Sequence, residues 1–83
     1  MKITNNVKEF FELNDPFVEY AECIIYLNNK CIAKSNEVDA VCRPIIEDDS
    51  GEIISYDRLM EMIKDYRVES VDVDWRIAIY LTN

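Results

Sequence analysis

The chain has 83 residues, of which 49% are hydrophobic, and its 9 basic and 17 acidic side chains give a net charge of −8. This length predicts a single domain over residues 1–83, and the composition is that of a folded chain without the long apolar run of a membrane span. The sequence contains no histidine and only one glycine, which excludes nucleophiles activated by histidine, imidazole metal sites and a glycine-rich phosphate loop.

The first predicted element is a short helix. Asn6 is its expected N-cap, with Glu9 three positions later in the spacing of a capping box. Apolar side chains then recur at helical intervals, at Val7, Phe10 and Phe11. We expect the helix to end before Pro16, because a residue that precedes proline is pushed out of the α region.

A hairpin is predicted next. Residues 17–27 are rich in tyrosine, isoleucine, valine and phenylalanine, which favour a strand. Asn28 and Asn29 tolerate positive φ and therefore predict the turn, and residues 30–34 form the returning strand.

The middle of the chain predicts a further turn, a third strand and an acidic turn. Ser35 and Asn36 are turn-forming residues, and residues 38–46 are predicted to form the third strand, which Pro44 restricts to an edge or a bulge. Residues 47–52 are strongly turn-like, with the only glycine at a position that suits positive φ.

A second helix and a final strand complete the predicted elements. Ser55 is the expected N-cap of the helix, and Ile54 before it faces Leu59 as a hydrophobic staple. The apolar stripe of this helix consists of Leu59, Met62, Ile63 and Tyr66. Residues 71–82 alternate between apolar and polar side chains, which predicts one long strand with one buried face.

The predicted order is therefore α-β-β-β-α-β. Two amphipathic helices can bury their apolar stripes against one face of an antiparallel or mixed sheet. We accordingly expect a two-layer α+β fold, with two helices on one face of a four-stranded sheet and the other face open.

The open face supplies the first group of candidate contact residues. If the odd positions of residues 17–27 face the helices, the even positions face outward together with polar positions of the last strand. The outward candidates are Tyr20, Glu22, Tyr26, Asp72, Asp74 and Tyr80. Tyrosine gives a large contact area with few rotatable bonds, and carboxylates pair with arginine or lysine. This face is therefore predicted to bind a protein partner with a basic surface.

Two other interpretations of this face stay open. Tyrosine and isoleucine favour strands for reasons of packing alone. The face could also join two copies in a homodimer, although like charges would resist two-fold pairing and Lys34 and Arg76 would offset only part of the repulsion.

The acidic turn supplies the second group of candidates. Its carboxylates are Glu47, Asp48, Asp49 and Glu52. They lack the alternating ligands, the sixth-position glycine and the twelfth-position glutamate of a calcium-binding EF-hand loop. The default interpretation is an exposed charged turn. The alternative is mimicry of a phosphate backbone, because carboxylates from this turn and from other elements together would approach the charge density of DNA phosphates.

We expect no catalytic, metal or cofactor site. The three cysteines, Cys23, Cys31 and Cys42, lie in strand-like segments without a metal-binding spacing and are expected to be free thiols. Asp72 and Asp74 would lie about 6.6 Å apart on one strand, close to the separation in an inverting glycosidase, but a flat sheet offers no sugar-binding cleft.

The small size, the charge of −8, the mixed α/β order and acidic runs such as residues 47–52 resemble the small acidic inhibitors of phages and mobile elements, namely anti-CRISPR and DNA-mimic proteins. The resemblance rests on general character and transfers no residue by position. It implies a non-catalytic inhibitor that occludes the nucleic-acid channel or a regulatory surface of a host defence nuclease such as a CRISPR-Cas enzyme.

The charge also bears on partners. An acidic chain repels phosphate backbones and anionic lipids, so we expect neither direct nucleic-acid binding nor membrane binding. The first residues contain no apolar stretch of a signal peptide, and we expect the chain in the cytoplasm, in the host cell if it is phage-encoded. The competing hypotheses are an immunity or antitoxin protein that neutralises a cognate toxin, and a structural homodimer module.

Overall fold

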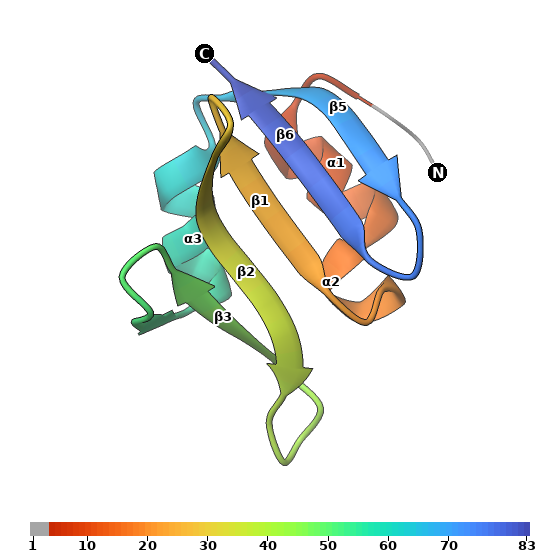
Figure 1. The fold of residues 1–83 in the computed structure, drawn as a ribbon, viewed down its shortest axis with the longest axis vertical. Helices are drawn as coiled ribbons and strands as arrows, with labels where there is room; N and C mark the ends of the chain where they lie inside the picture. Colours follow the sequence, from red (N-terminus) through yellow and green to blue (C-terminus); the bar gives the residue numbers. More distant parts are fainter. Residues whose placement is uncertain (1–3) are drawn as a thin grey trace.

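The computed structural model describes residues 4–83, in which three helices lie behind a six-stranded mixed sheet (Figure 1). The strand order is β4-β3-β2-β1-β6-β5; β1 and β6 are parallel, and every other neighbouring pair is antiparallel. The predicted α+β class is confirmed, whereas the four-stranded sheet and the order α-β-β-β-α-β are wrong in detail. The elements are α1 (Val7–Asn14), α2 (Pro16–Glu19), β1 (Cys23–Leu27), β2 (Lys30–Val38), β3 (Pro44–Asp48), β4 (Ile53–Ile54), α3 (Tyr56–Ile63), β5 (Arg67–Val73) and β6 (Ile77–Thr82).

The two predicted helices form, and side chains cap both of them. The Asn6 carboxamide oxygen accepts a hydrogen bond from the Glu9 backbone N–H at 2.9 Å, and the Ser55 hydroxyl accepts one from the Arg58 N–H at 3.0 Å. α1 ends where Asp15 adopts the left-handed conformation, with φ 44°. Each cap satisfies a backbone donor that a helix leaves without an internal partner.

The predicted strand over residues 17–27 is wrong in its first part. Pro16 starts the short helix α2, and only Cys23–Leu27 are extended. Proline at the first helical position has the backbone angle that a helix requires. Phe17 is buried beside Phe11, with ring centroids 5.5 Å apart, so the turn of helix gains a tertiary contact that its local strand preference does not offer.

The predicted turn at Asn28 and Asn29 is confirmed, with φ values of 51° and 69°. The turn expected at Ser35 and Asn36 is wrong, because β2 continues to Val38 and buries Ser35 opposite Cys23. The chain reverses instead over residues 39–43. The third strand, predicted over residues 38–46, is wrong in its bounds: Val38 belongs to β2, and β3 begins only at Pro44. The first residue of a strand is a position that proline tolerates.

The predicted long strand over residues 71–82 is two strands joined by a turn. The Asp74 N–H donates to the Arg76 carbonyl at 2.8 Å within this turn. The register pairs Val71 with Ile79 and Val73 with Ile77, so the apolar side chains of both arms share one face. The predicted alternation therefore survives although the strand folds back on itself.

The core lies between the sheet and the helices. Its buried residues are Val7, Phe10, Phe11, Phe17, Cys23, Ile25, Ala33, Ile46, Leu59, Ile63, Val68, Ile77, Ile79 and Leu81. The odd positions of β1 point to this side, as predicted. Within residues 4–83 no helix is long and apolar enough to cross a membrane.

Candidate functional site

The side of the sheet opposite the helices is uncovered by the described part of the chain (Figure 1). Strand register arranges its side chains in two rows that run across neighbouring strands. The first row is Glu47, Lys34, Ile24, Ala78 and Asp72, from β3 to β5. The second row is Cys31, Tyr26, Tyr80 and Ser70, from β2 to β5. We call these two rows the open face.

The centre of the open face is aromatic and apolar. The Tyr26 and Tyr80 rings stack with centroids 4.9 Å apart and an angle of 9° between their planes. Beside them, Ile24 and Ala78 retain only 9% and 5% of their accessible surface, although the described helices all lie on the other side of the sheet. The two tyrosines are half-buried and form a flat platform between the outer strands.

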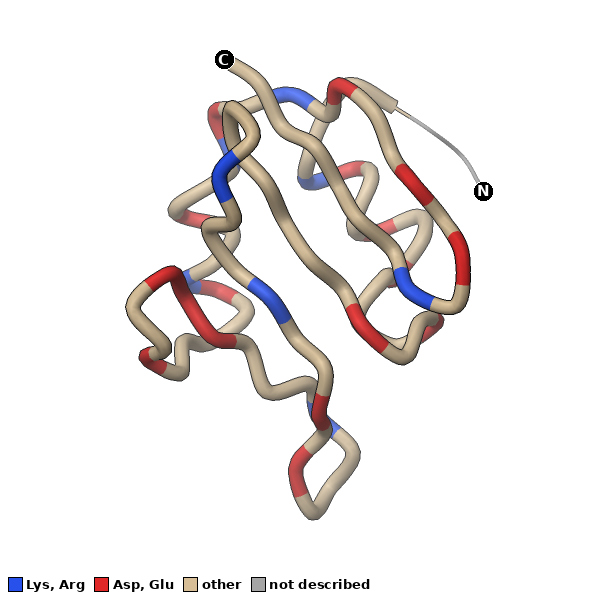
Figure 2. Tube along the Cα trace, viewed as in Figure 1, with Lys and Arg blue, Asp and Glu red and all other residues tan. Residues whose placement is uncertain are grey.

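Carboxylates flank this platform on both sides. Glu47 on β3 and Asp72 on β5 are separated by four strand intervals of about 4.8 Å each, or about 19 Å. Lys34 lies opposite Glu47 in the register, but within residues 4–83 neither Glu47 nor Asp72 forms an ion pair. Figure 2 shows the charged positions beside the uncharged central strand β1.

Three other predicted contact residues lie outside the strands. Tyr20 caps α2 and packs against the core, so the prediction that it faces outward in a strand is wrong. Glu22 pairs with Arg76 at 3.4 Å. Asp74 lies in the turn between β5 and β6. The structure therefore brings Tyr26, Tyr80 and Asp72 together on one face, with Glu47 at its far margin.

The acidic turn between β3 and β4 is organised by Asp48. Its Oδ1 accepts hydrogen bonds from the Ser50 hydroxyl at 2.7 Å and from the backbone N–H groups of Ser50 and Glu52, each at 2.9 Å. These bonds, that of the Ser50 hydroxyl above all, hold the pKa of Asp48 below its ordinary value. Gly51 adopts the left-handed conformation that this turn requires, with φ 85°.

The remaining acids of this turn differ in their surroundings. Asp49 pairs with Lys30 at 3.5 Å, whereas the exposed Glu52 forms no ion pair in the described part of the chain. Among residues 4–83, no group of three or more aspartate, glutamate or cysteine side chains is placed to hold a metal ion.

The three cysteines are free and have different surroundings. Cys23 is buried in the core, and burial raises the pKa of its thiol to about 12. Cys31 is half-buried opposite Tyr26 on the open face. Cys42 is exposed in the turn between β2 and β3, with φ 64°. Because a thiol reacts as its thiolate, Cys23 is the least reactive of the three by position and by ionisation.

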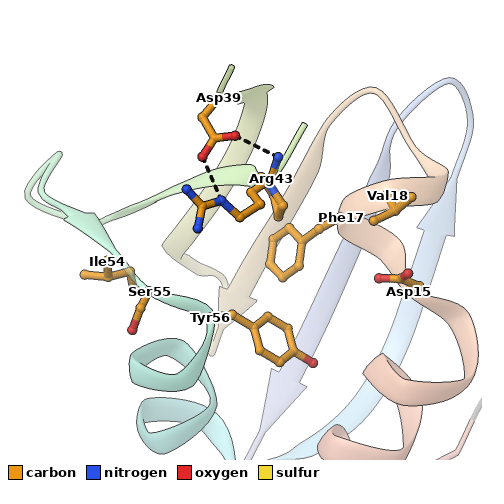
Figure 3. Close-up of a pocket in the computed structure, with 9 residues that line it drawn as sticks. Asp15, Phe17, Val18, Asp39, Arg43, Ile54, Ser55 and Tyr56 are labelled. Atoms are coloured by element: carbon orange, nitrogen blue, oxygen red, sulfur yellow. Dashed lines mark hydrogen bonds and ion pairs between the residues drawn. The ribbon is translucent and has the colours of Figure 1, made fainter. Parts of the chain in front are cut away.

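A hollow of about 510 Å³ lies on the helix side, between α2, the β2–β3 turn and the start of α3. Phe17 and Tyr56 line this hollow, and their ring centroids lie 6.2 Å apart (Figure 3). Burial, together with the charges of Asp15, Glu12 and Asp57, raises the pKa of Tyr56. Sequence reasoning missed this hollow because it assigned Phe17 to a strand.

Two charged residues at the rim of the hollow, Asp39 and Arg43, bind each other. Arg43 Nε donates to Asp39 Oδ2 at 3.1 Å, and Asp39 Oδ1 accepts the backbone N–H groups of Arg43 and Val41 (Figure 3). The backbone N–H of Arg43 is the leading cause that holds the pKa of Asp39 below its ordinary value. These groups stabilise the β2–β3 turn and leave the hollow with a mainly apolar floor.

No protein-family model matches this chain, and neither a curated protein nor a solved structure was found to match it. What the protein does is therefore inferred from the surfaces described above.

Proposed function

We propose that the protein is a non-catalytic inhibitor that binds a basic nucleic-acid-handling protein, such as a CRISPR-Cas or other defence nuclease, through its open face. The observation that carries this proposal is the uncovered Tyr26–Tyr80 platform between two acidic margins. Protein interfaces combine a well-packed aromatic centre with a charged rim, and tyrosine is enriched among residues that contribute most binding energy.

Electrostatics favours a cationic partner. The net charge of −8 attracts a basic surface over long range and accelerates the encounter at low salt. At contact, Asp72 and Glu47 reach opposite sides of the bound surface, since they stand about 19 Å apart. This arrangement suits a groove with two basic walls, with the tyrosines against its floor.

The proposed mechanism is steric and electrostatic occlusion. The protein occupies the groove in place of nucleic acid, one copy per site, without making or breaking a bond. Charge on the two margins imitates the sign of the phosphate backbone, and the aromatic platform between them adds contacts that a phosphate chain does not make.

The experiment is affinity capture from a bacterial lysate at low salt, with the retained proteins identified and then tested in competition with nucleic acid. The unmodified chain is expected to retain a nucleic-acid-binding protein that high salt releases. A Tyr26→Ala/Tyr80→Ala variant should lose it, and Leu13→Ala, at an exposed helix position, should keep it. Equal retention by both variants, or affinity that salt does not change, contradicts the proposal. Capture of a toxin would identify an immunity protein instead.

A homodimer is the second candidate, because the first row of the open face is self-complementary. Lys34 and Asp72 lie one position outside Ile24 and Ala78, on opposite sides. A two-fold axis along the strands would therefore place Lys34 of one copy over Asp72 of the other. Sedimentation equilibrium distinguishes the two candidates: a tight dimer that Lys34→Asp dissociates would assign the open face to self-association.

A further inference from the structure

In the part of the chain that the structure describes, the outer edge of β5 has no neighbouring strand along residues 69–73. We propose that this segment, residues 69–73, binds an extended lysine- or arginine-rich segment of a partner protein, which adds to the sheet as a further strand. β5 is the last strand in the sheet order, and among residues 4–83 it pairs with β6 alone along this segment. We call residues 69–73 the β5 edge. The β5 edge shares Ser70 and Asp72 with the open face. It would bind through backbone groups of β5 and not through the Tyr26–Tyr80 platform, so the proposal does not depend on the function proposed above.

Backbone hydrogen bonds show which groups of the β5 edge point outward. The Ile77 N–H donates to the Glu22 carbonyl at 2.9 Å, toward β1, so Ile77 does not bond its register partner Val73. In an antiparallel ladder, the backbone groups of successive residues alternate between the two sides. The N–H and C=O of Val73, and those of Val71 two residues earlier, are thus directed away from the sheet.

The chain itself shows that this edge accepts a strand. The Val68 N–H donates outward to the Asn5 carbonyl at 3.1 Å, and Asn6 forms an antiparallel bridge with Arg67. In the described part of the chain this pairing stops at Val68. Because unpaired strand edges bind extended peptides by continuing the ladder, the outward groups of Val71 and Val73 offer the next hydrogen bonds.

The opposite edge of the sheet, at β4, offers fewer backbone groups for an added strand. β4 consists of only Ile53 and Ile54, and Ser55 follows directly as the cap of α3. A strand this short provides few backbone groups for an added segment. Strand addition is therefore favoured at β5.

The acidic side chains along the β5 edge favour a basic partner segment. Glu69, Asp72 and Asp74 lie along β5 and the turn that follows it, where Figure 2 shows acidic positions down this side of the sheet. The two arginines nearest in sequence already have partners within the chain. Arg67 donates to the Asn83 carbonyl at 3.0 Å, and Arg76 pairs with Glu22.

The same charges disfavour a second copy of this chain. Edge-to-edge antiparallel pairing that places Val71 opposite Val73 of the copy also places Asp72 opposite Asp72 of the copy. Like charges directly opposite destabilise a strand pair, whereas a lysine or arginine at that position stabilises it. The β5 edge therefore fits a basic segment from another protein.

Apolar side chains at the end of the β5 edge add contact area for the aliphatic parts of such a segment. Val73 and Trp75 are 46% and 63% exposed, and the Arg76 guanidinium lies 5.7 Å from the centre of the Trp75 ring. Trp75 is the only tryptophan, so its fluorescence reports binding at this end of the edge.

The probe is a short blocked peptide of alternating lysine and valine residues, titrated against the full chain while Trp75 fluorescence is followed. The control peptide has the same sequence with alternate backbone nitrogens methylated, which removes hydrogen-bond donors and keeps the charge. The unmethylated peptide should bind at least about tenfold more tightly, and it should slow amide hydrogen exchange at Val71 and Val73. Equal affinity of the two peptides, or unchanged exchange at both valines, would overturn the proposal.

Matched variants test backbone and charge separately. Val73→Pro removes an outward N–H and should abolish peptide binding, whereas Val73→Thr keeps it and should not. Asp72→Lys should weaken binding about fivefold or more, while Glu52→Lys, with the same change in net charge at the opposite edge, should have a smaller effect. If Val73→Pro does not fold, the comparison of Asp72→Lys with Glu52→Lys tests the proposal. Equal effects of these two substitutions on peptide affinity would overturn it. Tyr26→Ala/Tyr80→Ala should leave peptide binding unchanged, which distinguishes this site from the Tyr26–Tyr80 platform.

Discussion

The rings of Tyr26 and Tyr80 lie nearly parallel, with centroids 4.9 Å apart. The register that pairs Tyr26 with Tyr80 across β1 and β6 sets this geometry. Within residues 4–83, β1 and β6 are the only parallel neighbours, and the two rings connect them on the side opposite the described helices. The rings therefore contribute to the fold as well as to the proposed contact surface.

This stacking predicts a coupling between the two tyrosines in stability. In a double-mutant cycle of Tyr26→Leu and Tyr80→Leu, the free energies of unfolding in urea should be non-additive by about 1 kcal/mol, the usual value for an aromatic pair. A control cycle pairs Tyr80 with Tyr56, which contacts Phe11 and Phe17 on the helix side. The control should be additive to within about 0.5 kcal/mol; an additive result for both cycles would contradict the stack.

The two faces of the sheet predict different costs for one change of side chain. Ile79 is fully buried against the helices, whereas Ile53 at the β4 margin is 66% exposed. Ile79→Val should lower the free energy of unfolding by about 1 kcal/mol, because it removes one methylene group from a packed core. Ile53→Val should change it by less than about 0.5 kcal/mol. Urea unfolding of both variants measures the difference, and equal costs would mean that this side of the sheet is covered.

The hydrogen bonds of Asp48 predict a dependence of stability on pH. They lower its folded-state pKa below the ordinary value of 3.8. The unfolded chain therefore binds the proton more readily, so the stabilisation is present above pH 3.8 and is lost as the pH falls through the folded-state pKa.

Thermal unfolding of Asp48→Asn between pH 2.5 and 6 tests this point. Asparagine keeps the oxygen acceptor and removes the ionisation, so the variant should melt lower than the unmodified chain at pH 6 and approach it in acid. Glu52→Gln, at an exposed side chain of the same turn, is the control for the loss of one negative charge, since it leaves the bonded Asp48 carboxylate in place. A constant difference for Asp48→Asn across the range would be inconsistent with the bonded carboxylate.

The cysteines are predicted to react in the order of their exposure. Cys42 is exposed and Cys23 is buried, with a pKa of about 12. Iodoacetamide at pH 8 should modify Cys42 first and Cys23 only after denaturation, as followed by peptide mass spectrometry. Denaturation in urea provides the control, because all three thiols should then react. Rapid native modification of Cys23 would contradict its position in the core.

Local signals predicted much of this fold. The caps Asn6 and Ser55 and the turn at Asn28 and Asn29 are encoded within a few residues, and each is where the sequence placed it. The helix-facing side of β1 followed from strand alternation, which also placed Tyr26 on the opposite side.

The remaining errors arise from contacts between distant residues. The strand preference of residues 17–19 is overridden by packing of Phe17 on Phe11. The turn at residues 74–76 divides the predicted last strand but keeps the alternation of apolar and polar side chains, so the sequence pattern does not indicate the turn. Periodicity detects which face is buried, but it does not detect a reversal that returns the chain to the same face.

A β-bulge in the β1–β2 pair determines which side of the sheet Lys34 faces. Continuous pairing from the Asn28–Asn29 turn would set Lys34 opposite Cys23, on the helix side. The register instead shifts between Ile25 and Tyr26, and Lys34 lies opposite Ile24. One extra residue thus moves a lysine to the other side of the sheet. The sequence carries no local signal for this shift, and the self-complementarity of the face depends on it.

The place of β6 between β1 and β5 sets the order in which the chain can assemble during translation. Both neighbours are synthesised earlier, and each lacks a partner on that side until Ile77–Thr82 leave the ribosome. Cooperative folding should therefore wait for these last residues. A chain stalled before Ile77 should be cleaved rapidly by protease, and the same chain with β6 fully extruded should resist.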